Sequence, residues 1–254
     1  MSSSEILALA ESVAKKAGIF LEQRPDSFEL TEKSSAVDFA TQMDQGAEKL
    51  IVEEILKVRP NDGIIAEEGS SRVSKSGITW VIDPLDGTTN YFYGLPGWNT
   101  SIAAKDENGY LVGAVCAPSI NSFWSAERGK GATFNGKKIK CNEPVKLEKA
   151  LIATGFTYDL QLRQSQGDLM SKLISKIRDV RRTGAAAVDL CYVAMGAVDA
   201  YFEATLKEWD FAAGGLIATE AGAKISGRHG KKPDSEMVIC AGPTLHSELV
   251  KIID

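Results

Sequence analysis

The sequence predicts an α+β protein in which sheets and helices are layered in two subdomains. Its 254 residues are 44% hydrophobic and 25% charged, which is ordinary globular composition with ample apolar side chains for a core. Short strand patterns separated by turns fill residues 99–140, and strand and helix patterns alternate after residue 143. We therefore expect an N-terminal α+β subdomain at 1–143 and a C-terminal α/β subdomain at 144–254.

The N-terminal subdomain is expected to begin with two helices. Apolar residues recur at helical spacing from Ser4 to about Gln23, and serines are available as caps. Residues 33–38 have the composition of a polar loop. A second helix is predicted to begin near Thr41 and to end before the Pro60-Asn61-Asp62-Gly63 stop signal.

Strands follow these helices. Residues 63–69 predict a short strand with two acids at its end, and the β-branched and aromatic residues 79–82 predict a buried one. Pro84 has no N–H group, so this second strand should stop near Asp83. Asn135-Gly136 is a strong signal for a two-residue hairpin.

The C-terminal subdomain shows two strand patterns and three helix patterns. The apolar strands lie around Ile152 and Val238, and the helices are predicted over 185–195, 211–221 and 244–253.

Composition and charge argue against several classes of protein. The formal net charge of −5 does not favour a nucleic-acid-binding surface. No segment has the length and apolarity of a membrane span, and the first residues do not resemble a signal peptide. The four cysteines are widely spaced without a C-x-x-C pair, which indicates reduced thiols in a cytoplasmic protein rather than zinc ligands or disulfides.

Carboxylates stand at the ends of predicted elements in three separate segments: Glu67 and Glu68, Asp83 and Asp86, and Asp210. Each has an ordinary structural explanation, such as a turn former or, for Asp210, a helix N-cap. If the segments converge, the carboxylates repel one another unless cations neutralise them. Oxygen ligands favour Mg²⁺, Mn²⁺ or Ca²⁺ over zinc.

The segment Gly87-Thr88-Thr89 follows the second pair of acids. Glycine lets the backbone approach a ligand closely, and the Thr88 hydroxyl can position a nucleophile. A helix that starts here would bind an anion at its N-terminus. Acids loaded with divalent cations beside such a segment indicate a metal-dependent phosphomonoesterase. The spacing of Asp83 and Asp86, with Pro84 between them, argues against the aspartyl-phosphate chemistry of haloacid-dehalogenase phosphatases.

The run Asp83-Pro84-Leu85-Asp86-Gly87-Thr88-Thr89-Asn90, with the upstream Glu pair and the downstream Trp209-Asp210, resembles the inositol monophosphatase family. The resemblance covers nearly the whole chain, from Lys33 to the last helix. It implies the layered α-β-α-β-α sandwich shared with fructose bisphosphatase and two or three Mg²⁺ ions, with Mn²⁺ possible. The metal ligands carried over are Glu67, Asp83, the Leu85 carbonyl, Asp86 and Asp210.

The resemblance also implies roles around these ligands. Thr88, paired with Asp44, would orient the attacking water together with Glu67, and Lys33 and Asp38 would match a mobile loop. The substrate contacts carried over are Gly87, Thr88, Gly184, Ala186, Glu203 and Asp210. The structural alternatives are close helix packing for Gly184 and Ala186, and a solvated strand end for Glu203.

The expected activity is hydrolysis of a small polyol phosphate, first of all inositol-1-phosphate. Histidinol phosphate and fructose-1,6-bisphosphate stay open as substrates, and we expect residues 158–166 to contact the leaving group. A metal-binding regulatory protein is the alternative outside the enzymes. Family membership further implies lithium inhibition and a homodimer, with a small phosphate ester rather than nucleic acid or membrane as the partner.

Overall fold

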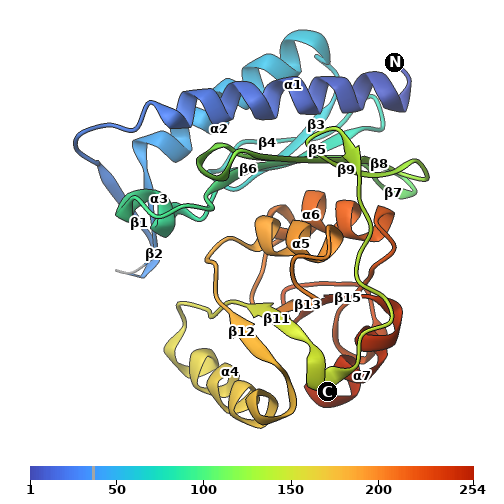
Figure 1. Ribbon diagram of the computed structural model, residues 1–254. Coiled ribbons are helices and arrows are strands. Elements are labelled where there is room, and N and C mark those ends of the chain that lie inside the picture. Colours follow the sequence, from blue (N-terminus) through green and yellow to red (C-terminus); the bar gives the residue numbers. More distant parts are fainter. Residues whose placement is uncertain (36–37) are drawn as a thin grey trace.

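The structure is a computed structural model that describes residues 1–35 and 38–254, and it consists of five alternating layers of helix and sheet (Figure 1). Helices α1 (Ser3–Glu22) and α2 (Gln42–Val58) cover one face of an eight-stranded sheet. Helices α5 (Ala186–Ala194) and α6 (Glu208–Glu220) separate it from a five-stranded sheet, beyond which lie α4 (Leu160–Leu173) and α7 (Pro243–Ile253). The expected α-β-α-β-α arrangement is confirmed.

The larger sheet is mostly antiparallel. Its strands are β3 (Gly63–Ala66), β4 (Ser71–Arg72), β5 (Thr79–Asp86), β6 (Asn99–Asp106), β7 (Gly109–Ala117), β8 (Ser122–Glu127), β9 (Gly131–Phe134) and β10 (Lys137–Lys138). Their order is β10-β9-β8-β7-β6-β5-β3-β4, and β3 pairs with β5 in parallel. The carboxyl ends of β3 and β5 therefore lie at the same edge, which brings the two acidic segments together.

The smaller sheet has the order β12-β11-β13-β15-β14. Its strands are β11 (Leu151–Thr154), β12 (Asp179–Arg181), β13 (Ala200–Glu203), β14 (Lys224–Ser226) and β15 (Val238–Ala241). A separate pair, β1 (Leu30–Ser35) and β2 (Asp38–Thr41), and the short helix α3 (Thr88–Tyr93) lie at the edge of the larger sheet. Single 3₁₀ turns occur at Pro118–Ile120, Leu147–Lys149, Ile174–Lys176 and Arg228–Gly230.

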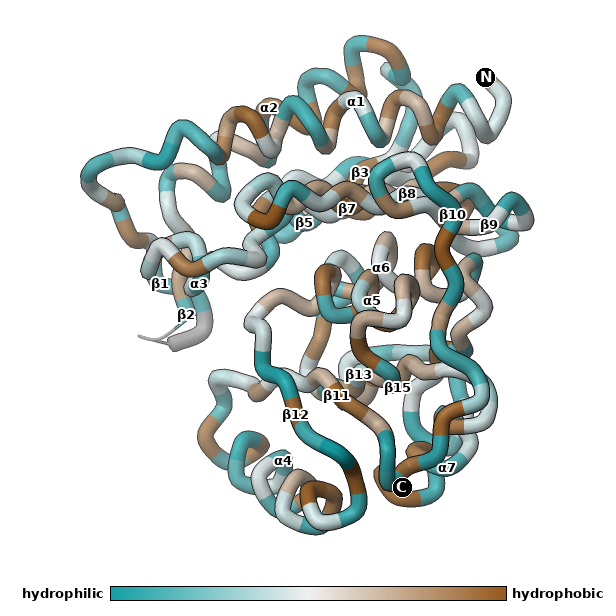
Figure 2. Tube along the Cα trace, viewed as in Figure 1, coloured by the Kyte–Doolittle hydropathy of each residue, from teal (hydrophilic) through white to brown (hydrophobic). Residues whose placement is uncertain are grey.

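The outer helices form because each has an apolar face and a capped N-terminus. Hydrophobic and hydrophilic residues alternate along α1 and α2 in Figure 2, and their buried residues pack on the sheet with Trp80 and Ile82. Ser2 caps α1 and Thr41 caps α2, in both cases as a capping box closed by an acid three residues later. For α2 that acid is Asp44, so helix formation also places a candidate catalytic residue.

The middle helices are buried on nearly all sides because they touch both sheets. Residues 211–218 of α6 are all buried, and they share one core with residues of both sheets, such as Val115 and Tyr201. A Cβ atom on Gly113 of β7 would lie 3.0 Å from the Ala213 carbonyl oxygen. Glycine at this position therefore allows α6 to pack directly on the sheet.

Two local expectations were wrong. A polar loop was expected at 33–38, but the described residues of this segment belong to two antiparallel strands. Leu30 pairs with Thr41 and Ser35 pairs with Asp38. Ala36 and Val37 lie outside the described residues. The strand expected to stop near Asp83 continues to Asp86. Its register with β6 shifts between Asp83 and Asp86, so Pro84 sits in a bulge where its missing N–H is not needed.

The larger sheet uses residues 63–138 and the smaller one residues 151–241. The division into subdomains near residue 143 stays a prediction, because α5 and α6 pack against both sheets. All four cysteines are free and buried. In the described part of the chain, no helix combines the length and the apolarity needed to cross a bilayer.

Candidate functional site

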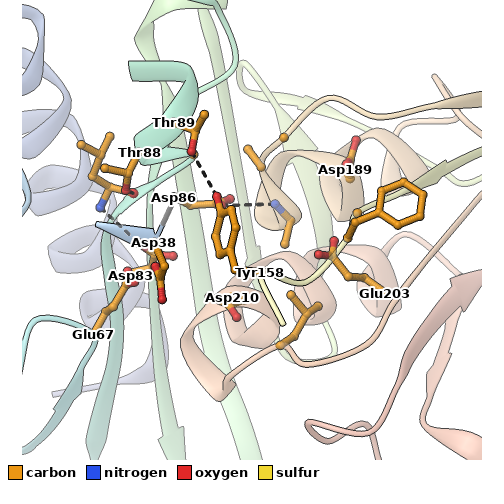
Figure 3. Close-up of a pocket in the computed structure, with 18 of the residues that line it drawn as sticks. Asp38, Glu67, Asp83, Asp86, Thr88, Thr89, Tyr158, Asp189, Glu203 and Asp210 are labelled. Carbon is orange, nitrogen blue, oxygen red and sulfur yellow. Dashed lines mark hydrogen bonds between the residues drawn. The ribbon is translucent and has the colours of Figure 1, made fainter. Parts of the chain in front are cut away.

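The three acidic segments meet in a pocket between the larger sheet and the middle helices (Figure 3). Its volume is about 160 Å³, below the ~300–1,000 Å³ of pockets for drug-sized ligands. It is lined by the candidate residues Lys33, Asp38, Glu67, Asp83, Leu85, Asp86, Gly87, Thr88, Gly184, Ala186, Glu203 and Asp210. Sequence reasoning therefore named residues that belong to one cavity, although their individual roles stay predictions.

Glu67 directly follows β3 and Asp83 lies within the parallel strand β5, and the two side chains are close to each other in Figure 3. Burial raises the pKa of both carboxyls, and Asp83 is raised further by the charges of Glu67, Asp86 and Asp210. The two acids also act on each other, because the charge of Glu67 contributes to the raised pKa of Asp83. This repulsion between neighbouring carboxylates is the kind that bound cations neutralise.

A buried glutamate of α2 fixes the turn that presents Glu67. Glu48 accepts hydrogen bonds from the Glu68 amide at 2.7 Å and from the Ser70 amide at 2.8 Å. Sequence reasoning missed this residue, because nothing in a helical Glu indicates that it caps a turn 20 positions away.

Asp86 is held by donors from two elements. Its carboxylate accepts the amides of Ala186 at 3.2 Å and Ala187 at 2.8 Å, and the Asn99 side-chain amide at 2.8 Å. Burial raises its pKa to about 6, although these donors oppose the shift. The Ala186 amide is thus already engaged by Asp86, which explains the position of Ala186 without a substrate.

Thr88 and Asp44 form the expected pair. The Thr88 hydroxyl lies 2.9 Å from Asp44 Oδ1 and 3.1 Å from the Leu85 carbonyl oxygen. Asp44 is buried, which raises its pKa, while hydrogen bonds from Thr41 and Thr88 lower it. Gly87 caps α3 with a φ of 87°, a left-handed conformation in which a side chain would be strained.

Lys33 reaches the acids from β1. Its Nζ atom lies 2.8 Å from Glu67 Oε1 and also donates to Glu68. Burial lowers the pKa of Lys33, but the two carboxylates outweigh this effect and raise it overall. Lys33 and Asp38 both line the pocket, and in this structure an ammonium group supplies positive charge beside Glu67.

Asp210 is not the N-cap that the sequence suggested. Lys207 occupies the cap position, and Asp210 is the third residue of α6, whose carboxylate accepts the Lys207 amide. Burial and the charge of Glu67 raise its pKa well above the ordinary value. The helix begins one turn earlier than predicted, because Glu208 and Trp209 continue it toward the N-terminus.

The opposite wall contains the predicted substrate contacts. Glu203 ends β13, and the Tyr201 hydroxyl donates to its Oε2 atom at 2.7 Å. Glu203 is partly exposed at the end of its strand, and burial of its carboxyl raises its pKa to about 7. Gly184 lies where a Cβ atom would come within 2.8 Å of Asn90, so close packing contributes to that position.

Several lining residues were not predicted, namely Phe39, Thr154, Gly155, Phe156, Ala185, Arg182, Asp189 and Leu206. Most are common residue types whose spacing indicates only a strand or a helix. Tyr158, in the segment expected to contact the leaving group, reaches across the pocket, and its hydroxyl lies 3.1 Å from the Thr89 hydroxyl (Figure 3).

The chemistry of the donors fits a hard divalent cation. The group consists of four carboxylates and the Leu85 carbonyl, all oxygen donors of the kind that Mg²⁺ prefers. Within the described residues, no three His, Cys, Asp or Glu side chains are already drawn together as a metal-binding group. The ammonium group of Lys33 supplies positive charge beside Glu67 and Glu68.

Comparisons with known proteins show the family of this chain. The sequence profile of the inositol monophosphatase family matches residues 2–254. The chain is 36% identical over 242 residues to an inositol-1-monophosphatase of Mycobacterium bovis, covering 87% of this chain and 83% of the relative. It is 39% identical over 256 residues to the Nus factor SuhB of Pasteurella multocida, covering 98% and 95%.

A solved structure shows the same fold. The IMPase of Thermotoga maritima superposes with a TM-score of 0.89 at 32% identity, covering 98% of this chain and 96% of that one. The protein therefore belongs to the inositol monophosphatase family. Members of this family are generally metal-dependent, in agreement with the oxygen donors of the pocket.

Proposed function

We propose that this protein is a Mg²⁺-dependent phosphatase that hydrolyses a small polyol phosphate monoester, with inositol-1-phosphate as the first candidate. The observation that carries the proposal is the meeting of Glu67, Asp83, Asp86 and Asp210 beside the Thr88–Asp44 pair in one small pocket. Divalent cations held by these carboxylates and the Leu85 carbonyl would neutralise the phosphoryl group and activate a water.

The residues themselves would orient the nucleophile. The single hydrogen of the Thr88 hydroxyl points toward Asp44 or Leu85, which leaves an oxygen lone pair free to accept a hydrogen from the attacking water. Buried Asp44, with its raised pKa, is suited to receive the hydrogen of Thr88 in turn. Glu67, on the same side of the pocket, would hold the other side of that water.

The size of the pocket and the name of the Mycobacterium relative favour a small monophosphate. Histidinol phosphate and fructose-1,6-bisphosphate are the alternatives within the family. The Nus-factor relative keeps a binding or regulatory role open as a non-enzymatic alternative, but the net charge of −5 does not favour nucleic acid. A homodimer, lithium inhibition and a cytoplasmic location are part of the proposal by family resemblance.

A phosphatase screen tests the proposal. Inositol-1-phosphate, histidinol phosphate, fructose-1,6-bisphosphate and adenosine-3′,5′-bisphosphate are compared in Mg²⁺ and in EDTA, with phosphate release as the readout. We expect the highest kcat/KM for inositol-1-phosphate, none in EDTA, and a loss of roughly 100-fold or more in Asp83→Asn. Asp26→Asn, at an exposed position, is the matched control.

No turnover of any substrate in Mg²⁺ would support the regulatory alternative. A normal rate for Asp83→Asn would remove that residue from the mechanism. Lithium titration and light scattering of the purified protein check inhibition and the dimer.

A further inference from the structure

One cationic side chain of the pocket has no place in the mechanism above. Among the described residues that line the pocket, Lys33 and Arg182 are the two with a positive charge. Lys33 Nζ donates to Glu67 and Glu68. Arg182 donates no hydrogen bond and forms no ion pair with any residue that the structure describes. Its guanidinium group therefore keeps its N–H donors for water or for a ligand.

The loop between β12 and α5 sets the position of this guanidinium group. The Asn90 side-chain amide donates to the Thr183 carbonyl oxygen at 2.8 Å, which fixes the loop beside α3. Gly184 has a φ of 96°, and a Cβ atom there would lie 2.6 Å from Arg182 Nη1. The Arg182 side chain therefore lies over Gly184, which also lines the pocket, and the absence of a side chain at Gly184 gives it room.

The preceding arginine has a different environment. Arg181 ends β12, and its Nη1 atom donates to Asp179 at 2.7 Å and to the Val180 carbonyl oxygen at 2.8 Å. Arg181 does not belong to the lining of the pocket. Of two adjacent arginines, one is therefore engaged by its own strand and the other keeps its donors at the pocket.

Arg182 acts on the wall that is opposite the candidate metal ligands. Burial raises the pKa of Glu203 to about 7 and that of Asp189 well above its ordinary value, and the charge of Arg182 opposes both shifts. In Figure 3 these two acids lie on the other side of the pocket from Glu67 and Asp83. Because both acids are at least partly protonated near neutral pH, they do not cancel the positive charge of Arg182.

We propose that Arg182 binds a second phosphate group on the leaving alcohol, so that the pocket accepts sugar bisphosphates in addition to polyol monophosphates. The phosphoryl group that reacts would lie at the candidate metal ligands and does not need this guanidinium group. Because the pocket is small and Arg182 is exposed, the second phosphate would lie at the rim. The planar donors of a guanidinium group match the oxygens of a phosphate.

This inference rests on the proposed phosphatase function and names a second substrate class for that same site. Its members are compact alcohols with one phosphate at the candidate metal ligands and another at the rim. Inositol-1-phosphate stays the first candidate. Arg182 is a specificity-determining residue, because it would contact the substrate away from the bond that breaks.

The test compares fructose-1-phosphate with fructose-1,6-bisphosphate, which differ only in the second phosphate, in Mg²⁺. We expect Arg182→Gln to raise the KM for the bisphosphate by about tenfold or more, the effect of one hydrogen bond between charged groups. The kcat for both substrates and the KM for fructose-1-phosphate should stay close to those of wild type. Arg182→Lys keeps the charge without the planar donors and should retain part of the discrimination.

Arg181→Gln is the matched control, because it removes the same charge from the adjacent position and should follow wild type on both substrates. The same rise in KM in Arg181→Gln would show a general effect of surface charge and overturn the inference. An equal loss on both substrates in Arg182→Gln would show a structural role and overturn it too, as would an unchanged KM for the bisphosphate.

A binding measurement separates this inference from the proposed function. Isothermal titration in Ca²⁺, which takes oxygen ligands as Mg²⁺ does, compares the affinities of the two sugar phosphates. If wild type shows no phosphatase activity, tighter binding of the bisphosphate by wild type that is lost in Arg182→Gln still supports the phosphate subsite. Equal affinities of wild type for both sugar phosphates overturn it.

Discussion

The buried acids of the pocket have different environments, and these set what each can do. Asp86 has three donors and a pKa of about 6, whereas Glu203 has one tyrosine hydroxyl and a pKa of about 7. Asp189 is buried, and burial raises its pKa well above the ordinary value. Carboxyl groups that line one pocket thus include a structurally anchored group and a group that titrates near neutrality.

The raised pKa of Glu203 predicts a pH effect on stability. Because the folded protein keeps this proton up to about pH 7 and the unfolded chain releases it near 4.5, unfolding releases a proton between these values. The protonated Glu203 carboxyl therefore makes its full contribution to the free energy of unfolding below pH 4.5, and this contribution is lost as the pH rises to about 7. Without metal, Glu203→Gln should be more stable than wild type at pH 8, by on the order of 3 kcal/mol.

Urea unfolding in EDTA at pH 4.5, 6 and 8 measures this difference. The exposed Glu107→Gln should follow wild type at every pH. Parallel curves for wild type and Glu203→Gln would contradict a raised pKa at Glu203.

At the scale of elements, close backbone packing places the site. Helix α6 carries Asp210 and crosses the larger sheet where β7 has Gly113, with the Ala213 backbone against it. Strand β5 bulges at Pro84 and still brings Asp83 and Asp86 to the pocket. The position of each acid therefore depends on how a whole helix or strand packs.

Two identical substitutions at glycines should have opposite effects. Gly113→Ala places a Cβ atom 3.0 Å from the Ala213 carbonyl, so we expect a destabilisation of about 1–3 kcal/mol. Gly167→Ala, on α4 with nothing within 4 Å, should stabilise by roughly 0.5–1 kcal/mol through better helix propensity. Thermal unfolding followed by circular dichroism measures both, and a stabilised Gly113→Ala would show that α6 can move away without cost.

At the scale of the whole molecule, the acids join parts of the chain that are distant in sequence. Glu67 and Asp83 come from the larger sheet, and Asp210 comes from the helix layer between the sheets. A cation that binds all of them would stabilise the packing of these layers, because it binds the folded chain and not the separated acids.

Addition of Mg²⁺ should therefore raise the midpoint of thermal unfolding. At about 100 times the dissociation constant the gain is about 2.7 kcal/mol, which for a chain of this length is a rise of roughly 5–10 °C. Asp210→Asn should lose most of the rise, and NaCl of equal ionic strength should not produce it. Differential scanning fluorimetry across a Mg²⁺ titration measures it, and an unchanged midpoint in wild type would contradict a metal site at these acids.

Patterns of neighbouring residues predicted α1, α2, α5, α6 and α7 and the 135–136 hairpin, whose turn residues have the expected positive φ angles. They did not predict α4 or the strands β12, β13 and β14. They also placed acids at the ends of elements, and the residues carried over by the family resemblance, apart from Asp44, line one pocket. Three features required the packed chain: the bulge at Pro84, the strands β1 and β2, and the helical position of Asp210. These features depend on partners many tens of residues away, which only the folded arrangement of layers brings together.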